Sequence, residues 1–168
     1  MGLLGGTMET RRDLFVYKLG AALTMEKTIL DMLPELEEHA THDQMKVALG
    51  HHREETERHV QNLERAFTAL GEDVDDSPCP AIEGLEKEGQ ANLKMVDDTL
   101  NDAVIASGVC ETEHHEIAAY EGLIVNARAM GEADVAALLE QNLADEKSML
   151  EKGKQMAEQI AQGMAPVA

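Results

Sequence analysis

Aromatic side chains are nearly absent from this chain: two Phe and two Tyr make up 2% of its 168 residues, and there is no Trp. Strands are enriched in aromatic and β-branched residues, so this scarcity argues against a sheet protein. The hydrophobic 43% must build a core from Leu, Ala, Val, Ile and ten Met. Ala, Leu, Glu, Met and Gln favour helices. The sequence therefore predicts one all-α domain over 1–168, with a core at about 8–162.

Basic residues are also scarce. Lys and Arg total 14 against 33 Asp and Glu, so the net charge is -19. Nucleic acids and anionic membranes both attract positive surfaces, so neither is expected as a partner. The acidity serves either solubility or the attraction of cations, including a metal substrate.

Long apolar runs and paired cysteines are missing as well. No run approaches the roughly 18 residues of a membrane span, and the first six residues are too short for a secretory signal. Cys79 and Cys110 are isolated and do not have the spacing of zinc ligands. A cytoplasmic protein with reduced thiols is therefore expected.

Apolar residues at helical spacing predict four long helices and a short one. These are expected at about 8–39, from 41 or 43 to 70, 81–95, 96–130 and 133–162, with a frayed tail beyond. Thr41 or Asp43 should cap the second helix and Gly71 should end it. Pro34 should kink the first helix.

The connections predict the topology. A tight turn at 131–134 makes the last two helices antiparallel, whereas the longer link over 71–95 is a crossover. Two hairpins joined by a crossover are the ferritin-like arrangement of an antiparallel four-helix bundle.

Polar residues interrupt the apolar stripe of the first helix at Glu26, which lies on one face with Leu23, Ile29 and Leu33. A buried lone carboxylate is costly unless it is paired or bound to a metal. The alternative is a loose bundle in which Glu26 reaches solvent.

The second helix contains the longest interruption, because no Leu, Ile or Met occurs between 49 and 63. His52, Glu55 and His59 fill the stripe there and lie within about 60° of one another. An exposed polar band with i,i+4 pairs would explain Glu54 and Glu57, but not the gap in the core.

The last two long helices are interrupted in the same way. Glu113 and Glu116 share a stripe with Tyr120, and Glu146 shares one with Leu139 and Leu143. His114 and His115 follow Glu113 directly. Each is either a surface residue or a residue that hydrogen-bonds to the metal ligands without binding the metal.

All these interruptions fall near mid-helix, so bundling would bring five Glu and one or two His to one level. Di-iron and di-manganese carboxylate proteins use such a set. Oxygen and imidazole ligands suit two ions of Fe, the first candidate, or of Mn or Zn. The usual Glu-x-x-His is missing, since Arg58 follows Glu55 at i+3 and Met149 follows Glu146. Which His is a ligand therefore stays open.

These motifs together resemble the YciE/YciF-like family of ferritin-like bacterial stress proteins over about 13–160. The resemblance is carried by Leu14-Phe15, Glu26-Lys27, Leu33-Pro34, His52-x-x-Glu55-Thr56, Cys79-x-Ala81-x-x-Gly84-Leu85, Glu113-His114-x-Glu116-Ile117-Ala118-x-Tyr120 and Leu143-x-x-Glu146-Lys147. It implies a homodimer with a rubrerythrin-like dinuclear site. The glutamates it implicates are Glu26, Glu55, Glu113, Glu116 and Glu146. Leu23, Leu150 and His59 depart from the family pattern around that site.

The leading functional hypothesis is a di-iron or di-manganese stress protein that reacts with peroxide or oxygen. Tyr120 would then donate a hydrogen bond to a bound oxygen species, or would simply pack. Two alternatives stay open: an iron-handling protein without turnover, and a non-enzymatic helical partner protein. Cys79 is either a redox partner or a packed loop residue.

Overall fold

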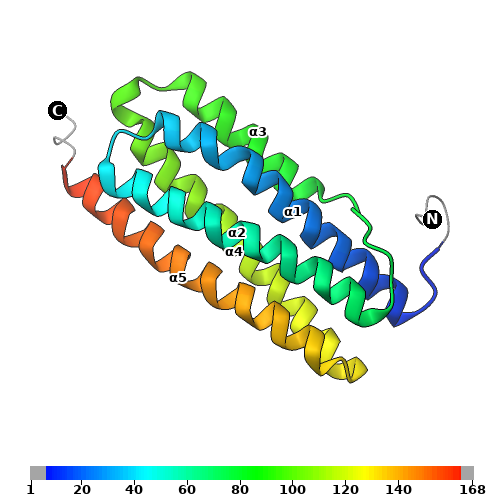
Figure 1. The fold of residues 1–168 in the computed structure, drawn as a ribbon. Coiled ribbons are helices and arrows are strands. Elements are labelled where there is room, and N and C mark those ends of the chain that lie inside the picture. Colours follow the sequence, from blue (N-terminus) through cyan, green and yellow to red (C-terminus); the bar gives the residue numbers. More distant parts are fainter. Residues whose placement is uncertain (1–6, 164–168) are drawn as a thin grey trace.

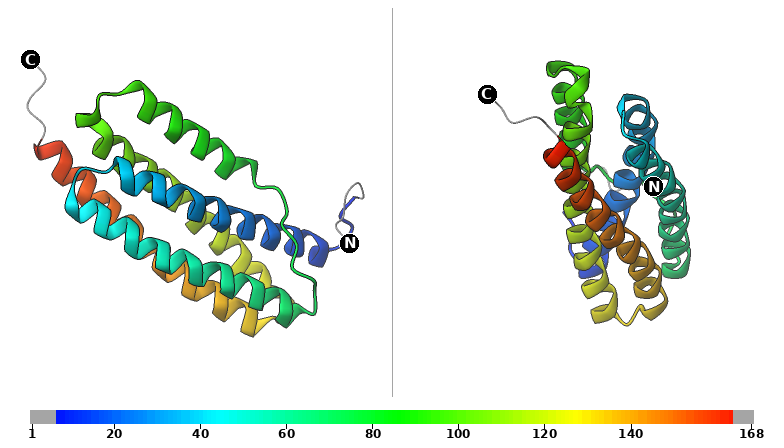
Figure 2. Two further views of the ribbon diagram at one scale, coloured as in Figure 1. Left: turned by 45° about the horizontal axis from the view of Figure 1, so that its top comes forward. Right: turned by 90° about the vertical axis from the view of Figure 1, so that its left-hand side faces the viewer.

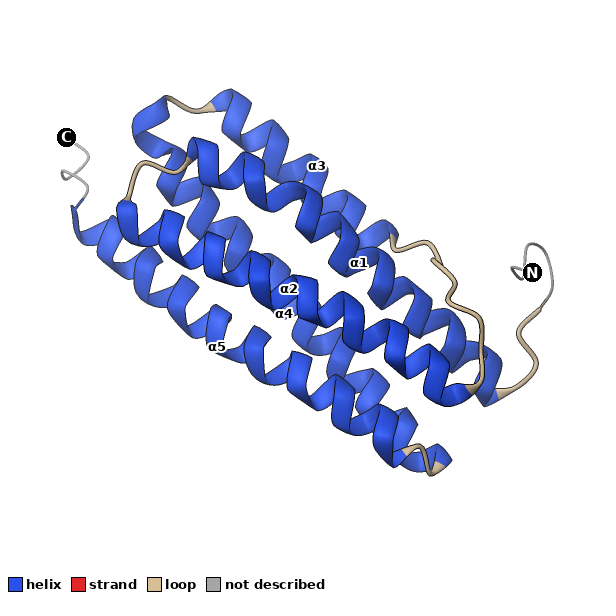
Figure 3. Ribbon diagram, in the orientation of Figure 1, coloured by secondary structure: helices blue, strands red, loops and turns tan. Residues whose placement is uncertain are grey.

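Helices make up 87% of the described residues, and no strand occurs among them. The computed structural model describes residues 7–163. Its elements are α1 (Arg11–His39), α2 (Asp43–Leu70), α3 (Pro80–Met95), the 3-10 turn η1 (Asp98–Leu100), α4 (Asn101–Met130) and α5 (Ala133–Gly163). The all-α prediction is confirmed (Figure 3). The N-terminal stretch excluded as a secretory signal, and the predicted tail beyond 163, lie outside the described residues.

The four long helices form an antiparallel bundle of two hairpins, α1/α2 and α4/α5 (Figure 1). α1 packs on α2 and α4, and α5 packs on α2 and α4. α3 lies outside this four-helix arrangement, against α4 and α1 (Figure 2). This is the predicted ferritin-like bundle with a short crossover helix.

The crossover loop is held tightly on α1 at a glycine. A Cβ on Gly20 would lie 2.6 Å from the carbonyl oxygen of Asp75, so a larger residue would push the loop away. Four residues on, Thr24 Oγ1 donates to the carbonyl of Ser77 at 2.7 Å. These contacts position the start of α3 beside α1.

Two predicted helix C-termini are confirmed, whereas the predicted N-terminal cap of α2 is not. Gly71 (φ 71°) and Gly131 (φ 82°) end α2 and α4 in the left-handed conformation that favours glycine. The predicted cap of α2 by Thr41 or Asp43 is wrong: its N-cap is His42, which makes no side-chain capping bond. The Thr41 amide donates instead to Asp102 of α4 at 2.8 Å, so a residue distant in sequence secures this corner.

Local side-chain bonds shift two helix starts from their predicted positions. α1 begins after Thr10, which forms a reciprocal capping box with Asp13. α4 begins five residues later than predicted, because Asp97 accepts from the Thr99 amide at 3.1 Å and forms a 3-10 turn. Pro34 lies inside α1, which continues to His39.

Aliphatic layers above and below mid-bundle form the core. Fully buried side chains include Leu19, Leu23, Met25, Leu49, Leu63, Phe67, Leu139 and Met149. Within residues 7–163, no helix is both long and apolar enough to cross a membrane.

Candidate metal centre

All seven residues predicted as ligands are buried, with exposed fractions of 5% or less. They come from all four long helices and are Glu26 on α1, His52, Glu55 and His59 on α2, Glu113 and Glu116 on α4, and Glu146 on α5. The solvent-reaching alternative for Glu26 is therefore wrong, since its exposed fraction is 0%. Glu54 and Glu57 are exposed, so the polar band of α2 is separate from its buried stripe.

The first group of potential ligands contains one histidine and three glutamates. His52, Glu113, Glu116 and Glu146 each offer one ligand atom, and these atoms lie within 4.8 Å of one another. His52 Nε2 is 3.3 Å from Glu113 Oε1. One cation among these atoms would be reached from α2, α4 and α5 together.

The second group contains His59, about two turns further along α2 than His52. Glu26, His59 and Glu146 also offer ligand atoms within 4.8 Å of one another. His59 Nδ1 is 2.9 Å from Glu146 Oε1 and 3.5 Å from Glu26 Oε2. Glu146 belongs to both groups, so its carboxylate lies where a carboxylate that bridges two metal ions would have to lie. The structure thus brings both histidines to the centre, where the sequence left the choice open.

Glu55 is buried next to the centre but belongs to neither group. Its carboxylate lies 3.7 Å from His52 Nδ1 and 3.0 Å from His51 Nδ1. Burial raises its pKa, but the neighbouring His52 ring and the charge of Lys152 lower that pKa overall. Glu55 thus lies on the Nδ1 side of the His52 ring, away from Glu113, from which a carboxylate could orient the ring. Its service as a direct ligand stays a prediction.

A buried hydrogen-bond network holds Glu26. The Tyr120 hydroxyl donates to Glu26 Oε1 and accepts from Asn142 Nδ2 at 3.0 Å. Asn62 Nδ2 donates in turn to Asn142 Oδ1 at 2.8 Å. Tyr120 therefore positions a carboxylate here, where the sequence suggested a contact with bound oxygen or simple packing. Asn62 and Asn142 were missed, although each carries an amide on the buried face of its helix.

Asp145 performs the same task for His59. Its Oδ2 lies 3.3 Å from His59 Nε2, on the side of the ring away from Glu146. A proton on Nε2 would leave the Nδ1 lone pair directed to the centre, as in many carboxylate–histidine–metal arrangements. Asp145 was not singled out because it lies outside the apolar stripe, and its place next to Glu146 was the only signal.

Burial strongly perturbs the proton affinities at the centre. Burial, followed by the charge of Glu146, raises the pKa of Glu113 to about 10 and that of Glu116 well above its usual range. The pKa of Glu26 is raised for the same two reasons. Burial would lower the pKa of His59, but the adjacent carboxylates of Glu146 and Glu26 raise it to about 11. Without cations, the folded centre therefore retains protons near neutral pH.

The unpaired atoms of the cluster provide a test of whether metals fit it. Both carboxylate oxygens of Glu116 are buried without a hydrogen-bond partner, and so is Oε2 of Glu113. Buried polar atoms are nearly always hydrogen-bonded, so these oxygens need another partner. Carboxylate oxygens and imidazole nitrogens are ligands that Fe, Mn and Zn accept. The donor set therefore fits such a metal ion.

The neighbouring histidines lie outside this cluster. His114 is exposed, whereas His115 is half-buried with Nε2 3.8 Å from the Sγ of Cys79. Cys79 is buried where α3 begins.

These features define a ferritin-like four-helix bundle with a buried carboxylate–histidine cluster at its middle. The chain belongs to the DUF892 family, a domain of unknown function, which it matches over residues 10–165. The resemblance to the YciE/YciF-like family is thereby confirmed.

Solved structures agree with this family. The chain is 33% identical to YcfI, a proposed structural protein of Rhodopseudomonas palustris, over 90% of this chain and 98% of that one (TM-score 0.87). It is 24% identical to the Escherichia coli stress protein YciF, over 94% and 100% (TM-score 0.88). A two-domain protein of Anabaena variabilis, with DJ-1/ThiJ/PfpI-like and ferritin-like domains, is 17% identical over 98% and 41% (TM-score 0.64). No curated protein matches the chain.

Proposed function

We propose that this protein binds two metal ions, iron in the first place and manganese or zinc as alternatives, and reacts with peroxide or oxygen. The observation that carries the proposal is the pair of buried, unpaired oxygens on Glu116, surrounded by further carboxylates. Carboxylates at one level of a dry bundle repel one another strongly. Two divalent ions would balance four of the five buried glutamates.

Each ion would have its own set of ligands. His52, Glu113 and Glu116 would hold one ion, Glu26 and His59 would hold the other, and Glu146 would bridge them. A redox-active pair bound there would supply electrons to a small oxidant.

The chain's own residues would keep the ligands in place. Tyr120 and Asn142 fix the carboxylate of Glu26, and Asp145 fixes the ring of His59. All seven ligand candidates are 5% exposed or less, and this burial strengthens the electrostatic interactions at the centre.

Three further properties belong to the same proposal. The likeness to YciF, a stress protein, supports a role in stress. A homodimer is proposed from the family resemblance, and a solution mass near 18.3 kDa would contradict it. A cytoplasmic location is proposed because Cys79 and Cys110 are both free.

Metal stoichiometry and turnover test the proposal together. The chelator-treated protein is titrated anaerobically with Fe(II), and bound iron per chain is counted. Two ions are expected for the natural chain, and fewer than two for Glu116→Gln. The control Glu57→Gln removes an exposed carboxylate and should retain both ions. Equal iron in all three proteins would contradict metal binding by this cluster.

Peroxide consumption then separates the functional alternatives. The iron-loaded protein should consume hydrogen peroxide beyond one equivalent per metal pair when a reductant is supplied, and Glu116→Gln should not. Stoichiometric iron without turnover would favour the iron-handling alternative. Absence of bound metal, with helicity retained, would favour the non-enzymatic partner protein.

A further inference from the structure

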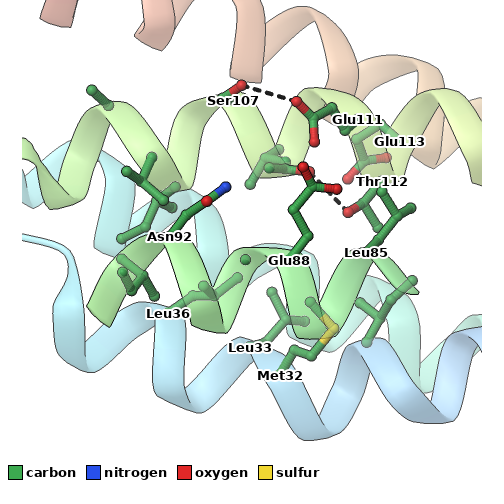
Figure 4. Close-up of a pocket in the computed structure, with 18 of the residues that line it drawn as sticks. Met32, Leu33, Leu36, Leu85, Glu88, Asn92, Ser107, Glu111, Thr112 and Glu113 are labelled. Carbon is green, nitrogen blue, oxygen red and sulfur yellow. Dashed lines mark hydrogen bonds between the residues drawn. The ribbon is translucent and has the colours of Figure 1, made fainter. Parts of the chain in front are cut away.

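A mostly aliphatic cavity of about 390 Å³ lies between α1, α3 and α4. Ile29, Leu33 and Leu36 line it from α1, Leu85 and Leu93 from α3, and Val104 from α4. Figure 4 shows Leu33 and Leu36 on the α1 side and Leu85 on α3, facing the polar residues of α4. Its volume falls within the range of small-molecule sites, about 300–1,000 Å³.

The inner end of the cavity reaches the candidate metal centre. His52 and Glu113, which belong to the first ligand group, both line it. The opposite end of the centre is closed, because Tyr120 is fully buried in its bonds to Glu26 and Asn142. An occupant of the cavity would therefore meet only the end of the centre that contains His52.

Two glycines on adjacent helices leave this space open. A Cβ built on Gly89 of α3, or on Gly108 of α4, meets nothing within 4 Å. Glycine inside a helix is less stable than alanine, and an unfilled apolar space also destabilises a fold. Neither glycine is needed for close helix packing, so a molecule that fills the cavity would regain contacts that the chain itself leaves unmade.

The rim of the cavity restricts the charge of an occupant. Glu88 of α3 and Glu111 of α4 are exposed and line the cavity, and Ser107 Oγ donates to Glu111 Oε1 at 3.2 Å (Figure 4). These two exposed carboxylates at the entrance disfavour an anion. The aliphatic walls disfavour a small, strongly hydrated molecule.

We propose that this cavity binds a neutral, largely apolar organic molecule whose polar end lies against His52 and Glu113. The molecule's role as a substrate rests on the proposed function of the metal centre. Binding itself requires only the cavity, so the two proposals fail separately.

Displacement of a neutral fluorescent probe, N-phenyl-1-naphthylamine, by 1-octanol tests the cavity. The full chain is used both metal-loaded and chelator-treated. We expect octanol to displace the probe from both forms. In the chelator-treated form, where no cation attracts a carboxylate, octanoate should bind at least about tenfold more weakly than octanol. Gly108→Leu, which fills the cavity, should weaken octanol binding at least about tenfold while its metal content stays unchanged.

Gly122→Leu is the matched control. Gly122 also lies on α4, a Cβ there also meets nothing within 4 Å, and it lines a second cavity of about 430 Å³ between α1 and α4. Octanol affinity should change less than about twofold in this variant. Loss of binding in Gly122→Leu with binding retained in Gly108→Leu would assign the ligand to the second cavity and overturn the proposal. Equal affinity of the chelator-treated chain for octanol and octanoate would overturn the neutral ligand class.

A spectroscopic measurement tests the placement against His52. In the natural chain loaded with Co(II), bound octanol should shift the visible absorption of the metal, and Gly108→Leu should show no shift. Octanol that binds without any shift would contradict the placement of its polar end. A chain that takes up no Co(II) would contradict the proposed metal centre, and the displacement result would still decide the cavity.

Discussion

Removing metal from the centre is expected to make the free energy of unfolding fall as the pH rises from 6 to 8. The folded, metal-free chain holds a proton on Glu113, whose pKa is raised to about 10 by burial and the charge of Glu146. In the unfolded chain the same group titrates near 4.5. The folded state therefore binds more protons over this range, and its stability is lost as the pH rises toward 10. His59 acts in the same direction, because its pKa is raised from 6.5 to about 11.

One extra proton in the folded state changes stability by about 1.4 kcal/mol per pH unit. Glu113 alone therefore accounts for about 3 kcal/mol between pH 6 and 8, and Glu116 adds to this because its pKa is raised as well. That is a large part of the roughly 5–15 kcal/mol that stabilises a typical domain. For a chain of this size, it corresponds to a fall in Tm of about 6–12 °C.

Thermal unfolding followed by circular dichroism, in chelator and at matched ionic strength, measures this slope. The metal-loaded protein should show no such fall, because binding requires deprotonated ligands and becomes tighter as the pH rises. Glu113→Gln should remove about 1.4 kcal/mol per pH unit from the metal-free slope. Glu57→Gln, an exposed control on α2, should leave the slope unchanged. A metal-free Tm that is equal or higher at pH 8 would refute the electrostatic reasoning.

Three further substitutions test the supporting structure. Tyr120→Phe leaves Glu26 Oε1 without its donor and should cost about 1–3 kcal/mol in chemical denaturation of the metal-free protein; no change would mean that the hydroxyl does not hold Glu26. Glu55→Gln should weaken binding of one metal ion about 10–100-fold in a competition titration, because Glu55 orients His52, and an unaltered affinity would exclude that role. Asp102→Ala should cost about 1 kcal/mol of thermal stability by freeing the Thr41 amide, and an unchanged Tm would show that this corner needs no acceptor.

Periodicity was sufficient to predict the helices of this fold, because buried faces repeat at the helical spacing. The ends at Gly71 and Gly131 were predictable because each glycine ends its helix locally, in a left-handed conformation. The contact that secures the start of α2 was not predictable, because the Thr41 amide donates to Asp102, about sixty residues away in sequence. The start of α4 was missed because the bonds of Asp97 compete with the helix, an effect that apolar spacing does not record.

The buried side chains of the candidate site were also predictable, because a carboxylate or imidazole in an apolar stripe is conspicuous. Their division into two groups that share Glu146 was not, because it depends on how helices rotate and slide against one another. The position of Glu55 beside the first group is one result of that packing. The partner of His59, Asp145, comes from the edge of α5, where sequence patterns carry no signal of this kind.

An anomalous difference map of crystals of the iron-loaded protein, measured at the iron absorption edge, would show directly whether the buried carboxylate–histidine cluster binds two metal ions. Two peaks are expected in each chain, one among His52, Glu113 and Glu116 and the other between Glu26 and His59, with Glu146 between them. Fully iron-equilibrated crystals that show no peak at these residues, or iron bound only at surface carboxylates, would contradict this expectation.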